Sequence, residues 1–158
     1  MRVLLAIGDD PRESRVQWLL EATGHAVIRG APKGEELLGF IEGVAHLQAA
    51  LVSQEALGRK WPRLLRQLRK RAPHLLVILL LGPKSERAWR LAVLAGAFEA
   101  VSASAPDAAI VQTVRRALAY AVGRVVGELS TEDGTGGWTD RPAAPGLPQG
   151  IAVGARTG

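Results

Sequence analysis

Two adjacent acids, Asp9 and Asp10, are the residues of this chain whose types and spacing are best suited to chemistry. They directly follow an apolar run at residues 3–7, which predicts a buried strand that ends in a turn. Carboxylate oxygens are the ligands that Mg²⁺ prefers, so the pair is a candidate for a weak metal site. Acids also suit the start of a helix, and Pro11 favours one here. The sequence leaves both interpretations open.

Short apolar segments alternate with helical patterns along the chain, and these elements would position the acids. Strands are predicted at residues 3–7, 25–28, 49–52, 75–81 and 98–102, and helices at about residues 11–23, 35–43, 59–71, 85–95 and 104–127. The alternation and the short connections predict a parallel sheet with helices on both faces. Five strands indicate the α/β, flavodoxin-like (βα)5 doubly wound fold with strand order 2-1-3-4-5, whose sites lie at the carboxyl ends of the strands.

Composition limits the classes of protein that the chain can form. Hydrophobic residues make up 47% and charged residues 22%, which favours a globular core over a disordered chain. The lack of cysteine excludes disulfides, thiolate metal sites and thiol nucleophiles. No apolar run reaches the roughly 18 residues of a membrane span, and the N-terminus lacks the pattern of a signal peptide. We therefore expect a cytoplasmic protein.

Three features occur in one consistent order: Asp9-Asp10, then Arg15, and Ala95-Gly96-Ala97 before the fifth predicted strand. Together with the spacing of the strands, they make this part of the chain resemble the receiver domain of response regulators, the CheY-like family. The resemblance covers about residues 2–127, and we predict a receiver-like domain over residues 1–127. It implies that the two acids bind Mg²⁺ and that a third carboxylate, on the third strand, accepts a phosphoryl group.

The other positions of that phosphorylation site depart from the family pattern. The acceptor position falls on Ser53, whose hydroxyl cannot form an acyl phosphate. Leu81 replaces a hydroxyl residue after the fourth strand, and Ala103 and Ser104 replace a lysine and a proline after the fifth. Glu55 is an alternative metal ligand. The resemblance therefore implies a degenerate pseudo-receiver that is not phosphorylated, is not an enzyme and has no cofactor beyond weakly bound Mg²⁺.

The positive charge of the chain is concentrated in one predicted helix. Seven of the 20 Lys and Arg residues lie in residues 59–71, which contain no acid. Helical spacing places four of them on one stripe, opposite an apolar stripe of Trp61, Leu64, Leu65 and Leu68; the four are Arg59, Arg63, Arg66 and Lys70. A basic helix of this kind is either a solvated outer face or a docking surface for an acidic partner, an anionic membrane or nucleic acid. Its shortness and lack of interleaved aromatics argue against nucleic acid.

The favoured function is an interaction module that docks on a protein partner or forms a homodimer. In receivers the fourth helix, fifth strand and fifth helix form the common dimer face, so the resemblance points to Trp89, Arg90, Arg115 and Arg116. An alternative is a flavodoxin-like cofactor-binding domain. A phosphate on the first loop would, however, be repelled by the two carboxylates there.

The composition changes after residue 127. Residues 128–158 are rich in Gly and Pro, which predicts a flexible linker or tail. An apolar segment at residues 151–153 leads into Gly154-Ala155-Arg156-Thr157-Gly158, which resembles the start of the deviant Walker loop of MinD/ParA-type ATPases. Pilus-assembly proteins of the CpaE/TadZ type carry a degenerate receiver ahead of such an ATPase. The resemblance therefore implies a fusion to a downstream ATPase domain, whereas the other interpretation is a plain Gly/Ala-rich tail.

Overall fold

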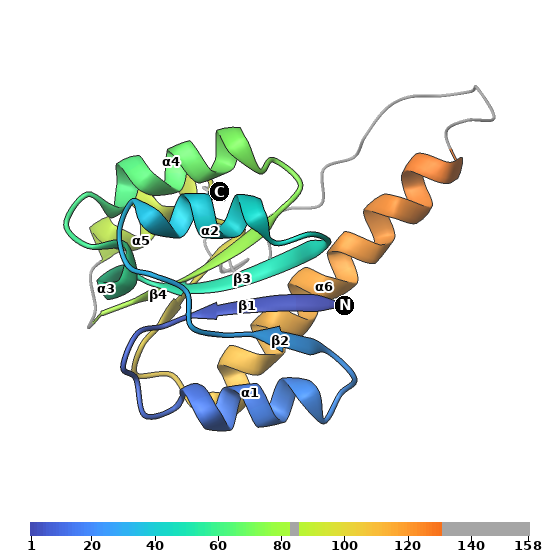
Figure 1. The fold of residues 1–158 in the computed structure, drawn as a ribbon, viewed down its shortest axis with the longest axis horizontal. Helices are drawn as coiled ribbons and strands as arrows, with labels where there is room; N and C mark the ends of the chain where they lie inside the picture. The colour runs from blue at the N-terminus through green and yellow to red at the C-terminus, as the bar shows by residue number, and fades with distance from the viewer. Residues whose placement is uncertain (83–85, 131–158) are drawn as a thin grey trace, which may run out of the picture.

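A computed structural model describes residues 1–82 and 86–130 of the protein. Five strands and six helices lie in these ranges, in an order that alternates except for one short extra helix. They are β1 (Arg2–Ala6), α1 (Glu13–Glu21), β2 (Ala26–Ile28), α2 (Glu36–Gly43), β3 (Leu47–Ser53), α3 (Gln54–Leu57), α4 (Trp61–Arg71), β4 (Leu76–Leu81), α5 (Glu86–Leu94), β5 (Glu99–Ser102) and α6 (Asp107–Ser130) (Figure 1).

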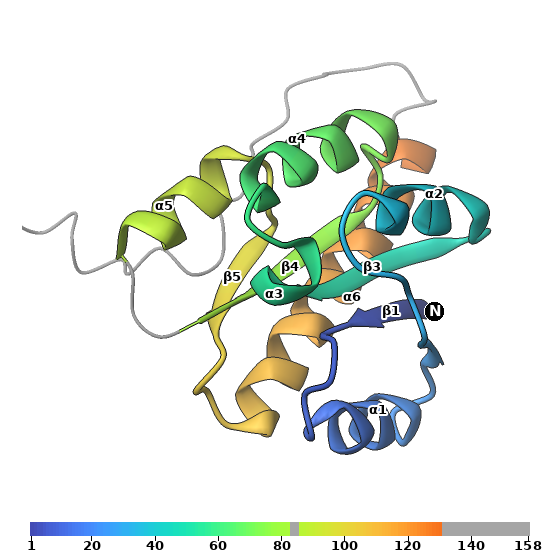
Figure 2. The ribbon, with the colours of Figure 1, turned by 60° about the vertical axis from the view of Figure 1, so that its left-hand side comes forward.

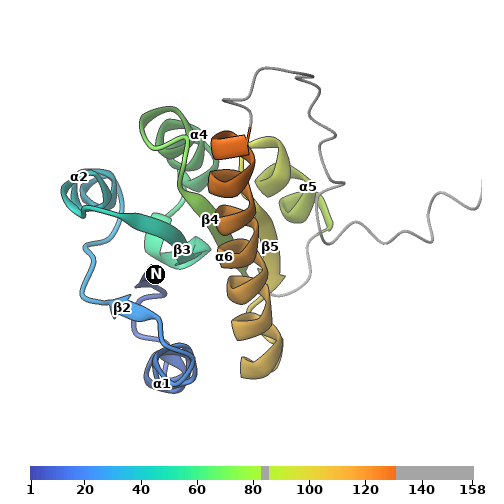
Figure 3. The same ribbon diagram turned by 90° about the vertical axis from the view of Figure 1, so that its right-hand side faces the viewer.

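The strands form one parallel sheet in the order β2-β1-β3-β4-β5, as predicted. Helices α2, α4 and α5 cover one face, where Figure 2 shows them side by side. Helices α1 and α6 cover the other face (Figure 3). The chain therefore has the α/β, flavodoxin-like and doubly wound fold that the alternation of its segments predicts.

Side chains alternate between the two faces along each strand, so the sheet separates two apolar clusters. In β1, Leu4 packs in the cluster under α2, α4 and α5, whereas Val3 and Leu5 pack in the cluster under α1 and α6. Every residue of β4 is buried, as expected for a central strand covered on both faces.

The turn between α5 and β5 depends on a glycine. Gly96 has a φ of +107°, a conformation that L side chains rarely adopt. The N–H of Ala97 donates to the carbonyl of Ala92 at 3.0 Å, which ends the helix and directs the chain into β5. The stem of Arg69 lies across Gly96, and its Nη1 donates to the carbonyl of Pro73 at 2.6 Å. This turn fixes the edge strand relative to α4.

Most predicted boundaries differ from the observed ones by one to three residues, and two of these differences affect the residues discussed below. The basic helix begins at Trp61, because a separate turn of helix, α3, follows β3 and ends at Gly58. Arg59 and Lys60 consequently precede α4 rather than forming its first turn. Helix α6 continues to Ser130, three residues past the predicted domain end. The rest of the predicted tail, including residues 151–158, lies outside the described residues.

Candidate functional site at the carboxyl edge of the sheet

A cleft of about 1130 Å³ lies where the strands end, and several positions of the expected phosphorylation site line it, although Leu81 and Ser104 do not. Because β1, β3, β4 and β5 are parallel, their carboxyl ends meet at one edge of the sheet. The lining includes Asp9, Asp10, Ser53, Glu55 and Ala103. The structure thus brings together residues that are separated by up to 94 positions in the sequence.

Asp10 is held by the guanidinium of Arg12. Arg12 Nε donates to Asp10 Oδ1 at 3.1 Å and Nη2 donates to Oδ2 at 2.8 Å, while the backbone N–H of Arg12 also donates to Oδ1 at 2.9 Å. Both side chains are largely buried, at 19% and 17% exposure. The hydrogen bonds from Arg12 hold the pKa of Asp10 below its ordinary value. Asp10 is therefore an ionised carboxylate whose two oxygens are already engaged.

Arg12 also links the first loop to the last one. Its Nη1 donates to the carbonyl of Ala105 at 3.2 Å, in the connection between β5 and α6. Arg15 makes a second link, since its Nε donates to Asp107 Oδ2 at 2.7 Å in the first turn of α6. The start of α1 is thereby attached to the start of α6 at two points.

Asp9 is oriented differently from Asp10. Its side chain is 97% exposed, and Lys33 Nζ lies 3.4 Å from Oδ2. No group of three His, Cys, Asp or Glu residues within 1–82 and 86–130 is arranged to hold a metal ion. A cation at Asp10 would have to displace the Arg12 guanidinium, and the third carboxylate is absent. The donor set therefore does not fit Mg²⁺ as it fits in the family.

Ser53 has a structural use of its own. It is 7% exposed, and its Oγ accepts a hydrogen bond from the backbone N–H of Ala56 at 3.0 Å. This makes Ser53 the N-cap of α3. Glu55 is exposed on the same short helix. The acceptor position of the family thus holds a hydroxyl that satisfies an otherwise unpaired backbone donor.

The remaining degenerate positions make apolar or local contacts, and of these only Ala103 lines the cleft. Leu81 is buried in the cluster under α2, α4 and α5. The N–H of Ala103 donates to the carbonyl of Leu81 at 2.6 Å, and Ser104 bonds only locally, to Ser102. Gln54 Oε1 accepts from the N–H of Gly82 at 3.3 Å and joins the ends of β3 and β4.

The expected interaction residues at the β5 edge are only partly free. Trp89 is half-buried, and its Nε1 donates to the carbonyl of Ala100 at 3.2 Å. Arg116 Nη2 donates to Glu99 Oε1 at 2.8 Å, whereas Glu99 Oε2 is buried without a partner. Burial raises the pKa of Glu99, although Arg116 opposes the shift. Arg87 and Arg90 are exposed on α5, and Arg90 lies 3.7 Å from Glu86. Arg115 is exposed as well, but it lies near His25 at the other edge of the sheet: burial, and then the positive charges of the N-terminus and of Arg115, lower the pKa of His25.

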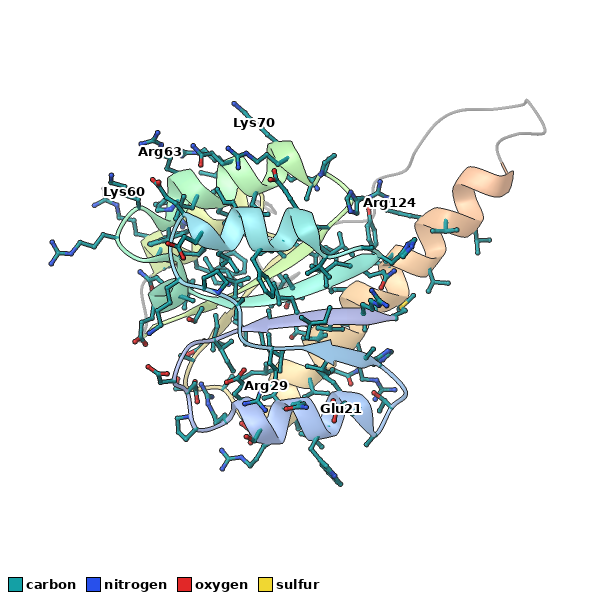
Figure 4. All side chains as sticks on the ribbon, viewed as in Figure 1. Glu21, Arg29, Lys60, Arg63, Lys70 and Arg124 are labelled. Carbon is teal, nitrogen blue, oxygen red and sulfur yellow. The ribbon has the colours of Figure 1, made fainter. Side chains whose placement is uncertain are left out.

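The four stripe residues of the basic segment lie on the solvent side, as their spacing predicts. Trp61, Leu64, Leu65 and Leu68 are buried, and Arg59, Arg63, Arg66 and Lys70 are exposed. Figure 4 shows Lys60, Arg63 and Lys70 pointing away from the body of the protein.

Sequence reasoning missed three residues that shape this structure: Arg12, Gln54 and Glu99. The spacing Asp10-x-Arg12 is the one local signal that could have identified Arg12, because a side chain two residues on can reach back to a turn aspartate. Gln54 and Glu99 depend on contacts with residues 28 and 17 positions away. No local pattern in the sequence predicts such contacts.

Comparison with known proteins gives a likeness of fold. No family model and no curated protein matches the sequence. Among solved structures, a CheY-like receiver domain protein of Methanospirillum hungatei is 20% identical with a TM-score of 0.67, and covers 78% of this chain and 97% of its own. The orphan response regulator HP1043 of H. pylori is 14% identical with a TM-score of 0.64, and the match covers 75% of this chain and 96% of HP1043.

Pilus-assembly proteins are structural neighbours as well. The CpaE protein of Burkholderia thailandensis is 18% identical with a TM-score of 0.63, and covers 75% of this chain and 98% of its own. None of the helices in the described ranges has the length and hydropathy needed to cross a membrane. The structural neighbours of this chain are thus response-regulator receiver domains and CpaE pilus-assembly proteins, and its fold is the CheY-like, flavodoxin-like fold that they share.

Proposed function

We propose that this chain is a receiver domain that works without phosphorylation, as a non-catalytic interaction module in a signalling or regulatory system. The observation that carries the proposal is the hydrogen bond from Ala56 N–H to Ser53 Oγ at 3.0 Å. At the position where a receiver needs a carboxylate, this chain has a hydroxyl that caps a helix.

The Asp10–Arg12 pair supports the same proposal. A phosphorylated receiver needs a divalent cation to offset the charge of the phosphoryl group and of its acceptor. Here the guanidinium of Arg12 supplies a fixed positive charge to Asp10 and bonds to the loop after β5. The chain therefore holds its own loops in place without a metal or a phosphoryl group.

The interaction surface that we propose is formed by α5, β5 and α6, through which two copies or a protein partner would dock. β5 is the edge strand of the sheet, so this side has no further strand beyond it. Glu86, Arg87 and Arg90 are the exposed charges of α5 there, and the Arg116–Glu99 pair joins α6 to β5. In a two-fold dimer each copy contributes the same patch, so Arg90 of one copy would pair with Glu86 of the other.

Treatment with beryllofluoride or acetyl phosphate in the presence of Mg²⁺ tests the absence of a phosphoryl switch. Amide ¹⁵N–¹H spectra are recorded before and after addition, with a phosphorylatable receiver as the positive control. We expect no saturable shifts for Asp10, Ser53 or Ala103. Stoichiometric shifts at these three strand-end positions would overturn the proposal.

Sedimentation equilibrium tests the interaction surface. If the protein dimerises through α5, β5 and α6, Arg90→Glu weakens the dimer, whereas Ser14→Glu on α1 leaves it unchanged. Equal effects of the two substitutions would place the interface elsewhere. A strictly monomeric protein at high concentration would rule out the homodimer and leave docking on another protein.

We further infer that the chain acts next to an ATPase. This inference rests on the likeness to CpaE-type pilus-assembly proteins and on the Gly-rich segment at residues 154–158. The coding sequence after Gly158 tests it. Continuation into a Gly-x-Gly-Lys-Ser/Thr motif is expected, and a stop codon at that point would refute it.

A further inference from the structure

The exposed surface of α4 carries an unusual concentration of positive charge. The basic ridge consists of Arg59, Lys60, Arg63, Arg66 and Lys70, all of which are exposed. None of the five makes an ion pair within the part of the chain that the structure describes. Arg69 and Arg71 are used locally, by Pro73 and by Glu42 at 3.7 Å. The ridge is therefore available for a ligand.

The ridge has an acidic border on the side of α2, whereas α5 on its other side carries Arg87 and the Arg90–Glu86 pair. Helix α2 packs against α4 in the same layer, and its exposed residues include Glu36 and Glu42, with Glu35 in the turn before it. Neighbouring helix axes are about 8–10 Å apart. A broad anionic surface that touched α4 would therefore meet the glutamates of α2 as well. This arrangement favours a partner no wider than a single helix or strand.

Groove binding to duplex DNA does not fit this layer. The major groove is about 12 Å wide and admits one helix of about 10–12 Å diameter. Helix α4 has α2 on one side and α5 on the other, as Figure 2 shows, so it cannot enter the groove alone. Contact with the phosphate backbone would bring the α2 glutamates near phosphates, which opposes binding.

An anionic membrane fits no better. A helix that binds a bilayer surface places large apolar side chains next to its basic ones. The exposed large apolar residues of the described chain are Met1, Trp18, Leu94, Val122, Val125 and Val126. None of them lies on α4 or α2, and the neighbouring helix α5 contributes one, Leu94 at its last residue. The ridge therefore has no apolar anchor among its own residues.

An acidic helix has the dimensions of the ridge. Arg63, Arg66 and Lys70 lie on one stripe with spacings of three and four residues, and they span about 10 Å along α4 at 1.5 Å per residue. Arg59 precedes the helix and lines the cleft at the carboxyl edge of the sheet. Carboxylates at positions i, i+3 or i+4, and i+7 of a partner helix repeat at the same rise. Arginine is also well suited to pair with carboxylates, because its guanidinium forms two parallel hydrogen bonds to one.

We infer that the basic ridge of α4 is a docking surface for an acidic helical segment of a partner protein. Its core lies on a different helix from the α5–β5–α6 interface proposed above, so the two surfaces can be engaged together. Docking through this ridge depends on salt concentration, because each of its charges is exposed and screened by ions.

Fluorescence anisotropy with the full chain tests this inference. The probes are a labelled peptide of about 20 residues with Glu at heptad spacing, a peptide of the same composition with its Glu residues in one block, a short DNA duplex and vesicles containing phosphatidylglycerol. We expect the heptad peptide to bind most tightly, with an affinity that falls as salt rises. Tighter binding of DNA or vesicles, equal binding of the two peptides, or no binding at all would overturn the inference.

Matched variants locate the binding surface. Arg63→Gln with Arg66→Gln removes two positive charges from the ridge and is expected to weaken peptide binding roughly tenfold. Ser14→Glu with Ala22→Glu makes the same change in net charge on α1, on the other face of the sheet, and leaves the affinity nearly unchanged. Equal losses for the two double variants would mean that net charge alone drives binding, which contradicts a specific ridge.

Neutralising the acidic border gives a second measurement. Glu35→Gln with Glu36→Gln removes the charge on α2 that opposes a broad polyanion. DNA binding is expected to rise in this variant by a larger factor than binding of the heptad peptide. An equal rise for both ligands would show that α2 does not determine the width of the partner.

Discussion

Arg12 donates to both carboxylate oxygens of Asp10, at 3.1 and 2.8 Å, and its remaining amino group reaches the carbonyl of Ala105 at 3.2 Å. One side chain thus joins the loop after β1 to the loop after β5. In a receiver these loops are coordinated by a metal ion and by a lysine that responds to the phosphoryl group. Here the chain's own side chain makes the link, which supports the proposal that the domain works without a phosphoryl switch.

Removing the guanidinium is expected to create a cation site. In Arg12→Gln, Asp10 loses its charge partner, and a carboxylate without one attracts a divalent cation more strongly. A Mg²⁺ titration followed by ¹⁵N–¹H spectra should give saturable shifts near Asp10 in the variant and not in the unmodified protein. Arg15→Gln is the matched control, because Arg15 pairs with Asp107 instead. Equal Mg²⁺ responses in all three proteins would show that Arg12 does not block the site.

The same ion pair predicts how stability depends on pH. Asp10 has a folded-state pKa below its ordinary value of 3.8, so its contribution is fully present above that value and is lost as pH falls through the lowered pKa. Arg12→Ala should reduce the free energy of unfolding by about 1–2 kcal/mol at pH 7. The difference between the proteins should shrink below pH 3.8, as urea unfolding at several pH values can show. A difference independent of pH would assign the effect to lost packing of the Arg12 stem.

The contribution of Glu99 to stability depends on pH in the opposite direction. Burial raises its pKa above the ordinary 4.5, so its contribution to stability falls as pH rises from that value through the raised pKa. In Arg116→Gln this carboxylate loses its cation, its pKa rises further, and the protein should lose about 2 kcal/mol at pH 7 and little at pH 4. Arg115→Gln is the control, since Arg115 is exposed on the same helix. An NMR titration of the Glu99 carboxyl carbon measures the pKa directly, and an unchanged value would contradict the prediction.

The cap role of Ser53 can be separated from any role in signalling. Ser53→Ala leaves the N–H of Ala56 without its acceptor in a buried position and should lower the free energy of unfolding by about 1 kcal/mol. Thermal unfolding of this variant is compared with Ser14→Ala, where the serine is exposed and makes no hydrogen bond in the described chain. If the two variants are equally stable, the hydrogen bond does not act as a cap.

The fold could be predicted from the sequence because its signals are local. Continuous apolar runs such as residues 75–81 indicate buried strands, and the spacing of Trp61, Leu64, Leu65 and Leu68 indicates the inner face of a helix. The proposed departures from the receiver phosphorylation site rest on local signals too, because each is a residue type at the end of a predicted strand. The extra helix α3 was not, because a four-residue helix has no periodicity to detect.

The partners of the site residues could not be predicted in the same way. Ser53 reads equally well as a strand-end residue or as a cap until the backbone of Ala56 is placed beneath it. Asp9 and Asp10 are adjacent in sequence, yet one is almost fully exposed and the other is enclosed by Arg12. This difference arises from the path of the loop, which depends on contacts with Lys33 and Ala105 in other segments.

The turn at Gly96 gives the last prediction. A Cβ at this position would lie 2.9 Å from Cγ and 3.1 Å from Cβ of Arg69, and its φ of +107° disfavours any L side chain. Gly96→Ala should therefore lower the free energy of unfolding by about 2 kcal/mol or more. Adding Arg69→Ala removes the contact with Cγ but leaves the contact with Cβ and the backbone strain, so the double variant should be more stable than the sum of the single effects. Urea unfolding of the four proteins measures this coupling, and strict additivity would show that the contact with Cγ of Arg69 does not contribute to the requirement for glycine.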